Sequence, residues 1–249
     1  MKRAIISDVH ANLEALRAVL ADISRQEITA IYCLGDTIGY GPNPRECLDL
    51  VMAHCAVCLL GNHDEAVLYD PEGFSSAAER AARWTRKQLA PCSDDERSQA
   101  RWDFLCRLPR FHRDGDRIFV HGSVRNPLSE YVFPEDVQDL RKMEGLFALI
   151  RRVAFQGHTH VAGIFSSQLR FVFPHEVPVG YPLGTEKVMI NVGSVGQPRD
   201  GDARAAYVVY DDETVHFRRV PYAAQITADK IHAEQELDDF LGDRLLAGH

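Results

Sequence analysis

The sequence predicts an α/β fold in which the first sixty residues pair their strands in parallel. Three short apolar runs of strand length cover residues 3–7, 28–34 and 55–60. Between them, residues 13–23 and 45–53 have apolar side chains at the spacing of one helical face. The order strand, helix, strand, helix, strand favours parallel pairing with right-handed crossovers. Each apolar run is also followed by a turn with Asp, His or Asn, so polar groups are expected where the strands end.

The start of the first helix is indicated by Asn12, whose side chain suits an N-cap. Residues 39–44 contain two glycines and two prolines and are therefore predicted as a loop before the second helix. After residue 64 the pattern changes to a helical insertion over about 65–109, with helices at 75–90 and 94–108.

The second half of the chain is predicted to return to strands. A hairpin is expected around Asp114-Gly115-Asp116, between residues 110–113 and 117–121. Residues 134–149 are predicted as a helix, and the tail from 222 to 249 as one or two amphipathic helices. The remaining expected strands are 152–156, 161–166, 169–173, 186–192, 205–210 and 214–220.

The bulk composition predicts one folded domain over residues 1–249 that contains the insertion. The formal net charge of −8 disfavours bulk nucleic-acid binding, which depends on Lys and Arg. A small anionic substrate remains compatible, because bound cations can dominate the field inside a site. No apolar run resembles a secretory signal or a membrane span, so no membrane partner and a cytoplasmic location are expected. A homo-oligomer is left open.

The cysteines fit reduced core residues of such a compartment. Cys55 and Cys58 have CxxC spacing, but no second pair follows, so a core role is favoured over a redox or zinc site. The six cysteines are Cys33, Cys47, Cys55, Cys58, Cys92 and Cys106.

The stretch that organises the chain is Gly61-Asn62-His63-Asp64, which is expected to form a turn after the third strand. Asp8-Val9-His10, Gly35-Asp36 and Gly157-His158-Thr159-His160 also follow apolar runs. In open α/β sheets, ligands bind outside the carboxyl ends of the strands. The polar residues at these four strand ends therefore predict a metal-binding site.

The candidate ligands comprise four imidazoles, two carboxylates and one amide oxygen. They are Asp8, His10, Asp36, Asn62, His121, His158 and His160. This set is too large for one tetrahedral zinc and suits two divalent ions. Mn²⁺ is the first candidate, and Fe, Zn²⁺, Ni²⁺ and Co²⁺ accept the same nitrogen and oxygen ligands.

A site that holds two metal ions favours hydrolysis of a phosphoester as the function. Ions roughly 3.5–4 Å apart lower the pKa of a shared water and neutralise an anionic substrate, so a metal-bound hydroxide could attack phosphorus. His63, next to Asn62, could then donate a proton to the leaving alkoxide. Asp64 is expected to hold the ring and tautomer of His63.

The motifs resemble, in the same order, those of the calcineurin-like metallophosphoesterases. The series comprises Asp8-Val9-His10, Gly35-Asp36, Gly61-Asn62-His63-Asp64, His121-Gly122 and Gly157-His158-Thr159-His160. The resemblance implies a four-layer α-β-β-α sandwich of two mixed sheets flanked by helices. It also implies that Asp8, His10, Asp36 and His160 bind one metal, and that Asp36, Asn62, His121 and His158 bind the other. Asp36 would bridge the ions, and His63 would be the acid, assisted by Asp64.

Two departures bear on the substrate. No arginine follows Gly35-Asp36, and Asp64 stands where the protein phosphatases have Glu, so a phosphoprotein substrate is disfavoured. The loops at 35–44 and 193–202 resemble a small prokaryotic branch described as phosphodiesterases or dinucleoside polyphosphate hydrolases. Without that arginine, Arg199 becomes a candidate phosphate contact, with a surface role as its alternative.

Weaker substrate-binding candidates are Ser194 and Asn191. Tyr40 could stack on a base or simply pack. The predicted function is thus a binuclear metal-dependent phosphoesterase for a small phosphodiester or nucleotide polyphosphate. The alternatives are a phosphomonoester or phosphoprotein substrate, and a non-catalytic metal-bound scaffold that binds a partner. The insertion at 65–109 could be a substrate cap or a dimer contact.

Overall fold

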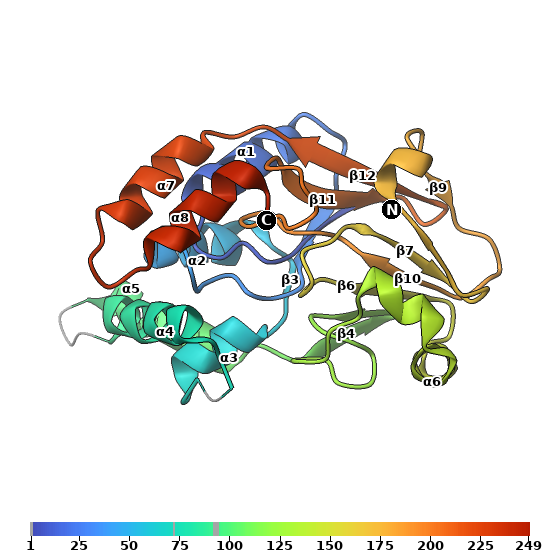
Figure 1. Ribbon diagram of the computed structural model, residues 1–249, viewed down its shortest axis with the longest axis horizontal. Helices are drawn as coiled ribbons and strands as arrows, with labels where there is room; N and C mark the ends of the chain where they lie inside the picture. The colour runs from blue at the N-terminus through green and yellow to red at the C-terminus, as the bar shows by residue number, and fades with distance from the viewer. Residues whose placement is uncertain (1, 72, 92–94) are drawn as a thin grey trace.

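The computed structural model describes residues 2–71, 73–91 and 95–249. Two mixed six-stranded sheets pack face to face, and helices cover the outer surfaces (Figure 1). The four-layer architecture that the family resemblance implies is therefore confirmed.

The first sheet contains the parallel strands that the sequence predicts at the start of the chain. Its order is β3-β2-β1-β11-β12-β9, with β1, β2 and β3 parallel and the remaining pairs antiparallel. The bounds are β1 Arg3–Ile6, β2 Ala30–Cys33, β3 Val57–Cys58, β9 Tyr181–Pro182, β11 Ala205–Tyr210 and β12 Thr214–Val220.

The second sheet has the order β4-β5-β6-β10-β7-β8, with a parallel core of β5, β6 and β10. The bounds are β4 Phe111–Asp114, β5 Arg117–Val120, β6 Val153–Gln156, β7 Gly163–Ser166, β8 Arg170–Val172 and β10 Val188–Asn191. The polar motifs of the sequence follow the carboxyl ends of the parallel strands in both sheets.

Alternating side chains divide each sheet between two cores. In β1, Ile5 packs between the sheets, whereas Ala4 and Ile6 face the outer helices. In β6, Phe155 packs between the sheets and Ala154 faces the opposite side. Both faces of these strands are buried, which explains why their sequences are continuous apolar runs.

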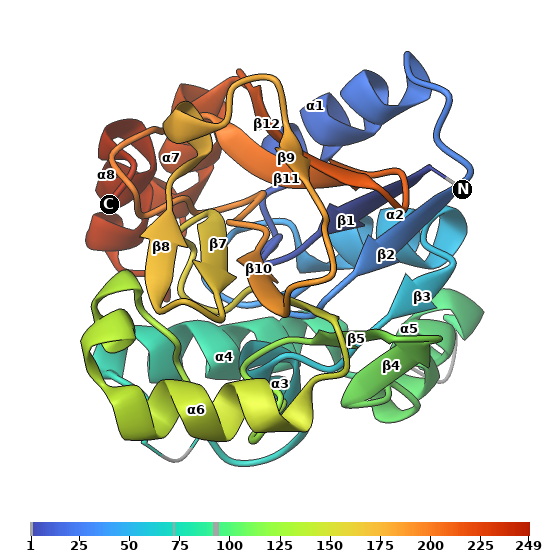
Figure 2. The same cartoon turned by 90° about the vertical axis from the view of Figure 1, so that its right-hand side faces the viewer.

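Helices α1 (Leu13–Ser24) and α2 (Pro44–His54) cover the first sheet, and α6 (Leu140–Leu149) covers the second. Figure 2 shows α1 and α6 on opposite sides of the two sheets. The Asn12 cap is confirmed, since its Oδ1 accepts a hydrogen bond from Ala15 N at 3.1 Å. Among the helices described, none has the length and apolar character needed to cross a lipid bilayer.

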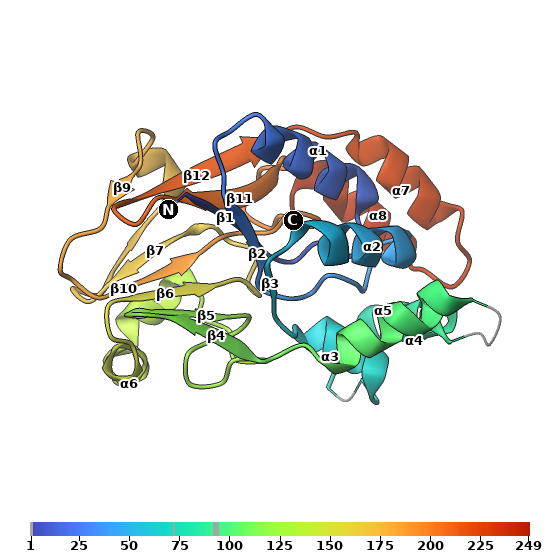
Figure 3. The same cartoon turned by 180° about the vertical axis from the view of Figure 1, so that it is seen from behind.

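The insertion contains α3 (Asn62–Leu68), α4 (Ser76–Leu89) and α5 (Glu96–Cys106), and the tail contains α7 (Ala224–His232) and α8 (Asp239–Ala247). Seen from behind in Figure 3, α3, α4 and α5 lie together beside the sheets, below α2 and α7. Trp84 of α4 shares an apolar cluster with Leu241 and Leu245 of α8. The two helical regions therefore pack on each other across one end of the molecule.

Several boundaries differ from the prediction. Gly61-Asn62-His63-Asp64 is the start of α3 rather than a turn, because the Asp64 carboxylate caps the helix from its third position. Residues 134–149 form a short 3₁₀ helix, Pro134–Gln138, followed by α6, because Asp139 accepts from Lys142 N and starts a new helix. A further 3₁₀ helix covers Pro174–Glu176, and β9 was not expected.

The cysteines that the structure describes are free. Cys33 and Cys47 are buried, as expected for core residues. Cys106 is exposed at the end of α5, so the core prediction is wrong for that residue. Cys92 lies outside the described residues.

Candidate metal centre

The predicted ligands come together where the strands of the two sheets end. Asp8 and His10 follow β1, Asp36 follows β2, and Asn62 begins the helix after β3. His121 follows β5, and His158 and His160 follow β6. All except Asn62 are buried. Residues as far apart in the sequence as Asp8 and His160 thus meet at one point, where the parallel strands end.

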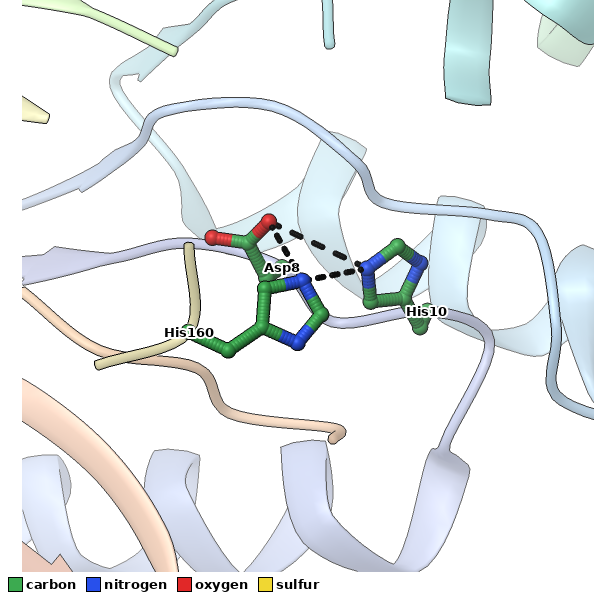
Figure 4. A group of neighbouring side chains, drawn as sticks. All are labelled: Asp8, His10 and His160. Carbon is green, nitrogen blue, oxygen red and sulfur yellow. Dashed lines mark hydrogen bonds and ion pairs between the residues drawn. The ribbon is translucent and has the colours of Figure 1, made fainter. Parts of the chain in front are cut away.

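One group of ligands consists of Asp8, His10 and His160 (Figure 4). His160 Nε2 lies 3.2 Å from Asp8 Oδ1 and 3.1 Å from His10 Nε2. The distance from His10 Nε2 to Asp8 Oδ1 is 3.8 Å. Three ligand atoms therefore converge on one small volume.

A second group consists of Asp36, His121 and His158, with Asn62 beside it. His121 Nε2 lies 3.0 Å from Asn62 Oδ1 and 3.1 Å from His158 Nδ1. The same nitrogen is 3.3 Å from Asp36 Oδ2. This group matches the second predicted ligand set.

Asp36 stands between the two groups. Its Oδ2 lies 3.3 Å from His121 Nε2 and 3.7 Å from His10 Nε2. Its other oxygen, Oδ1, accepts a hydrogen bond from His63 N at 2.8 Å, which fixes the carboxylate plane. Oδ2 is therefore placed to serve both groups, as a bridging carboxylate would.

The donor set fits divalent cations. Ring nitrogens face each other at 3.1 Å in both groups, and such pairs of lone pairs need a proton or a metal ion between them. Asp8 Oδ1 is buried without a hydrogen-bond partner among the described residues. An orphaned buried oxygen of this kind is costly unless a cation satisfies it.

Both carboxylates are held in the ionised form that binds metal. Burial alone would raise the pKa of Asp8, but the His160 and His121 rings hold it below its usual range. Burial opposes ionisation of Asp36 as well, and the His121 and His63 rings keep its pKa well below normal.

Backbone carbonyls orient two of the imidazoles. His160 Nδ1 lies 2.6 Å from the Gln197 oxygen, and His158 Nε2 lies 3.3 Å from the Ser129 oxygen. A carbonyl only accepts, so these nitrogens carry the protons and leave the opposite ring nitrogens free for metal. The sequence did not reveal Gln197 or Ser129, because main-chain acceptors leave no residue-type signal.

The loops that carry the ligands have unusual backbone geometry. Left-handed φ values occur at five of the seven predicted ligands, namely Asp8 (54°), His10 (47°), Asp36 (51°), His158 (68°) and His160 (61°). Non-glycine residues rarely adopt this region, and such strain concentrates at functional sites. Gly61 is required by close approach, because a Cβ there would lie 2.0 Å from Asp36 Oδ1.

The predicted pairing of Asp64 with the His63 ring is not formed. Asp64 accepts from Ile38 N at 3.2 Å and from Gly61 N at 3.0 Å, so its carboxylate is committed to the start of α3. His63 Nδ1 is buried and lacks a hydrogen-bond partner among the described residues. Burial, followed by the charge of Asp36, raises the Asp64 pKa to about 7.

A cavity of about 680 Å³ opens beside the second ligand group. Asn62, His63 and His158 are among the residues that line it. The Tyr131 ring stacks on His158, with centroids 3.7 Å apart, and is 41% exposed. Residues of α3, α4 and the segment between them also line the cavity.

The substrate-binding candidates fare differently. Tyr40 lines the cavity and also packs against α8, so both of its predicted roles are compatible with its position. Arg199 lies close by, with its Cζ 5.8 Å from the Tyr40 ring centre. Ser194 is fully buried. Its hydroxyl donates a hydrogen bond to the backbone oxygen of Asp8 and accepts one from Gln197 N. Its hydroxyl is thus used to hold the loops, which corrects its prediction as a substrate contact.

Asn191 is likewise committed to the scaffold. Its side-chain amide donates to the Gly157 oxygen at 2.7 Å and to Thr159 Oγ1 at 2.8 Å. The Asn191 side chain therefore supports the loop that carries His158 and His160 and does not contact the cavity.

Comparison with known proteins decides the family. The family model for the calcineurin-like phosphoesterase superfamily domain matches residues 1–214. The chain belongs to the calcineurin-like phosphoesterase superfamily. The resemblance seen in its motifs is thereby confirmed, and this phosphoesterase is a hydrolase of a metal-dependent family with groups able to hold metal ions.

Relatives of this phosphoesterase match along its whole length. A protein of Methanocaldococcus jannaschii, named only as uncharacterised, is 35% identical over 254 residues, which cover 98% of this chain and 97% of the relative. The crystal structure of a metallophosphoesterase from Sphaerobacter thermophilus is 35% identical, with a TM-score of 0.83 and 100% of both chains covered. A hypothetical protein from Pyrococcus horikoshii shares the fold at 18% identity, with a TM-score of 0.77 and 100% and 98% of the chains covered.

Proposed function

We propose that this protein is a binuclear metal-dependent phosphoesterase that hydrolyses a small phosphodiester or a nucleotide polyphosphate. The observation that carries the proposal is the position of Asp36 Oδ2 between two ligand groups, 3.7 Å from His10 and 3.3 Å from His121. One carboxylate oxygen facing two imidazole clusters suits two adjacent cations better than one.

The residues that would hold the ions are those that the family resemblance implies. Asp8, His10, Asp36 and His160 would bind one, and Asp36, Asn62, His121 and His158 the other. When bound, divalent cations supply Lewis acidity, which neutralises phosphoryl oxygens and lowers the pKa of water. Mn²⁺ is the first candidate, and Fe, Zn²⁺, Ni²⁺ and Co²⁺ suit the same donors.

His63 is the candidate proton donor for the leaving group. Its ring lines the cavity, and its centroid is 4.9 Å from that of His10 in an edge-on arrangement. The backbone amide of His63 is tied to Asp36 at 2.8 Å, so the ring keeps a fixed position relative to the ligands. Asp64 contributes by holding the start of α3 and thereby the His63 backbone.

The cavity supports a small organic ester over a phosphoprotein. About 680 Å³ is within the range of small-ligand sites. Tyr40, Tyr69, Phe74 and Tyr131 add aromatic surface to its lining, which suits a nucleoside. We also propose Arg199 as a phosphate contact and the 65–109 insertion as a wall of the cavity rather than a dimer contact.

A metal-loaded activity screen tests this function. Purified protein with added Mn²⁺ is given a phosphomonoester, bis(p-nitrophenyl) phosphate, a cyclic nucleotide and diadenosine tetraphosphate. We expect turnover of the diester or the dinucleotide, lost in Asp36→Asn. Asp103→Asn is the matched control, because Asp103 on α5 pairs with Arg107 at 3.5 Å outside the site.

The same screen can overturn the proposal. Stoichiometric metal with no hydrolysis of any of the four compounds would favour the non-catalytic scaffold. Wild-type rates in Asp36→Asn would show that the ligand assignment is wrong.

A further inference from the structure

The described residues that line the cavity beside the second ligand group include no lysine or arginine. The carboxylates among them are Glu65 and Asp70, and Glu65 is paired with Arg110 at 2.9 Å. A cavity that received further phosphoryl groups would be expected to offer paired N–H donors from basic side chains. The lining therefore favours an uncharged part of the substrate, while the reacting phosphoryl group lies at the candidate metal ligands.

Tyr131 is the residue of this lining whose ring stacks in parallel on a candidate metal ligand. Its ring centroid lies 3.7 Å from that of His158, with 16° between the ring planes. The Phe133 ring is also nearly parallel to it, at 9° and a centroid distance of 5.3 Å. These two neighbours fix the plane of the Tyr131 ring, yet the residue is 41% exposed and faces the cavity. A flat aromatic surface is therefore held in place and open to a ligand beside the candidate metal centre.

The loop that carries Tyr131 is fixed by its own hydrogen bonds. Ser123 Oγ accepts from Arg125 N at 3.1 Å and from Asn126 N at 3.0 Å. Lys142 of α6 donates from Nζ to the Tyr131 backbone oxygen at 2.9 Å. The Tyr131 ring is thus preorganised, so little conformational freedom is lost when a ligand binds to it.

Aromatic side chains of the helical insertion line the same cavity. Tyr69, which follows α3, is 65% exposed, and Phe74 lies in the segment before α4. The Phe74 ring centroid lies 4.8 Å from that of His63 in an edge-on arrangement. The cavity therefore brings aromatic surface from two separate parts of the chain to the proposed proton donor.

We propose that Tyr131 is a specificity-determining residue whose ring stacks on an uncharged aromatic group of the substrate, such as a nucleobase. The inference rests on the proposed function and narrows it. The preferred substrates are phosphoesters that carry a nucleoside, over phosphoesters of aliphatic alcohols. Every base has a π face, so stacking on Tyr131 should discriminate little among the bases.

A binding experiment tests the stacking role without turnover. Adenosine, which has no phosphoryl group, is titrated into the purified protein and followed by ligand-observed NMR, which detects millimolar affinity. We expect the dissociation constant to rise at least about fivefold in Tyr131→Leu and to stay near the wild-type value in Tyr131→Phe, which keeps the ring. Phe111→Leu is the matched control, since Phe111 on β4 is 51% exposed and is not among the residues that line the cavity. No binding by wild type, or equal binding by Tyr131→Leu and Phe111→Leu, would overturn the proposal.

A kinetic comparison separates this inference from the proposed function. KM and kcat are measured for the p-nitrophenyl ester of thymidine monophosphate and for methyl p-nitrophenyl phosphate, which share a leaving group and differ in the nucleoside. In Tyr131→Leu we expect the loss of kcat/KM for the nucleoside ester to exceed that for the methyl ester at least about fivefold, mainly through KM. A role limited to holding His158 would lower both equally, and equal losses would therefore overturn the stacking role and leave the phosphoesterase intact. No turnover of either ester by wild type would reject the proposed function, while the adenosine titration still decides the stacking role.

Discussion

At the residue scale, hydrogen bonds to the scaffold leave the candidate ligand side chains with few atoms free to bind a metal ion. Asp36 uses Oδ1 for the His63 amide and leaves Oδ2 to the two imidazole groups. His160 uses Nδ1 for a carbonyl and leaves Nε2 to face Asp8. Each of these two candidate ligands is therefore left with one defined atom, which is the preorganisation that metal sites require.

His63 is predicted to protonate the leaving group without binding metal. His63→Ala should lower kcat roughly 100- to 10,000-fold for a diester with a poor leaving group. The loss should be much smaller for a p-nitrophenolate leaving group, which needs no proton. Rates for both ester types, together with metal content by mass spectrometry, check this. A loss of bound metal, or equal losses for the two esters, would assign His63 to the ligand set instead.

At the element scale, the site depends on short connections after the strands. Three residues separate β3 from helix α3, which begins at Asn62, and its first turn carries Asn62, His63 and Asp64. Gly61, at the N-cap position, has no side chain that could cap the helix. Instead, the Asp64 carboxylate accepts a hydrogen bond from the Gly61 backbone amide. The helix start therefore holds a candidate ligand and the proposed proton donor at fixed spacing from Asp36.

This connection leaves no room for a side chain at residue 61. A Cβ on Gly61 would lie 2.2 Å from Asp36 N and 2.0 Å from Asp36 Oδ1. Gly61→Ala should displace Asp36 and release bound metal, with activity falling at least about tenfold, as is common when a supporting contact of a metal site is lost. Metal stoichiometry after dialysis measures the effect. Gly184→Ala is the control, since a Cβ there meets no atom within 4 Å. Full metal retention in Gly61→Ala would contradict the close-packing argument.

At the scale of the whole molecule, polar contacts join helices to sheets far from the site. Asp22, near the end of α1, accepts from the Tyr207 hydroxyl of β11 at 2.7 Å and pairs with Arg218 of β12 at 3.2 Å. Burial opposes ionisation of Asp22, but the Tyr207, Arg25 and Arg218 contacts lower its pKa below the usual value. The ionised carboxylate therefore stabilises the fold.

The sign of this effect predicts a pH dependence. Because the folded-state pKa is the lower one, the stabilisation is present above the unfolded pKa of about 3.9 and is lost as pH falls through the folded value. Asp22→Asn should reduce the free energy of unfolding by roughly 1 kcal/mol at neutral pH. The difference from wild type should shrink below about pH 3. Urea unfolding at both pH values tests this, and a pH-independent difference would contradict the role of the charge.

Much of the fold follows from patterns that a single chain displays. The apolar runs of β1 and β6 are continuous because both faces are buried, and their ends are marked by Asp8 and His158. Boundaries were less accurate where local signals compete. Gly61 and Asp64 form a capping pair across three residues, which looks like a turn when only residue types are considered. β9 has two residues and pairs with β12, which is too short a stretch for a local sequence pattern to mark it.

The sequence by itself determined the α/β class, the succession of strands along the chain apart from β9, and the seven candidate ligands, because period-two and period-3.6 patterns and strand-end motifs are local. Only the tertiary structure decided how those ligands are used. It showed that Asp36 Oδ2 faces both groups and that Asp64 is committed to backbone amides. Such relations depend on side-chain direction and long-range packing, which a linear sequence does not record.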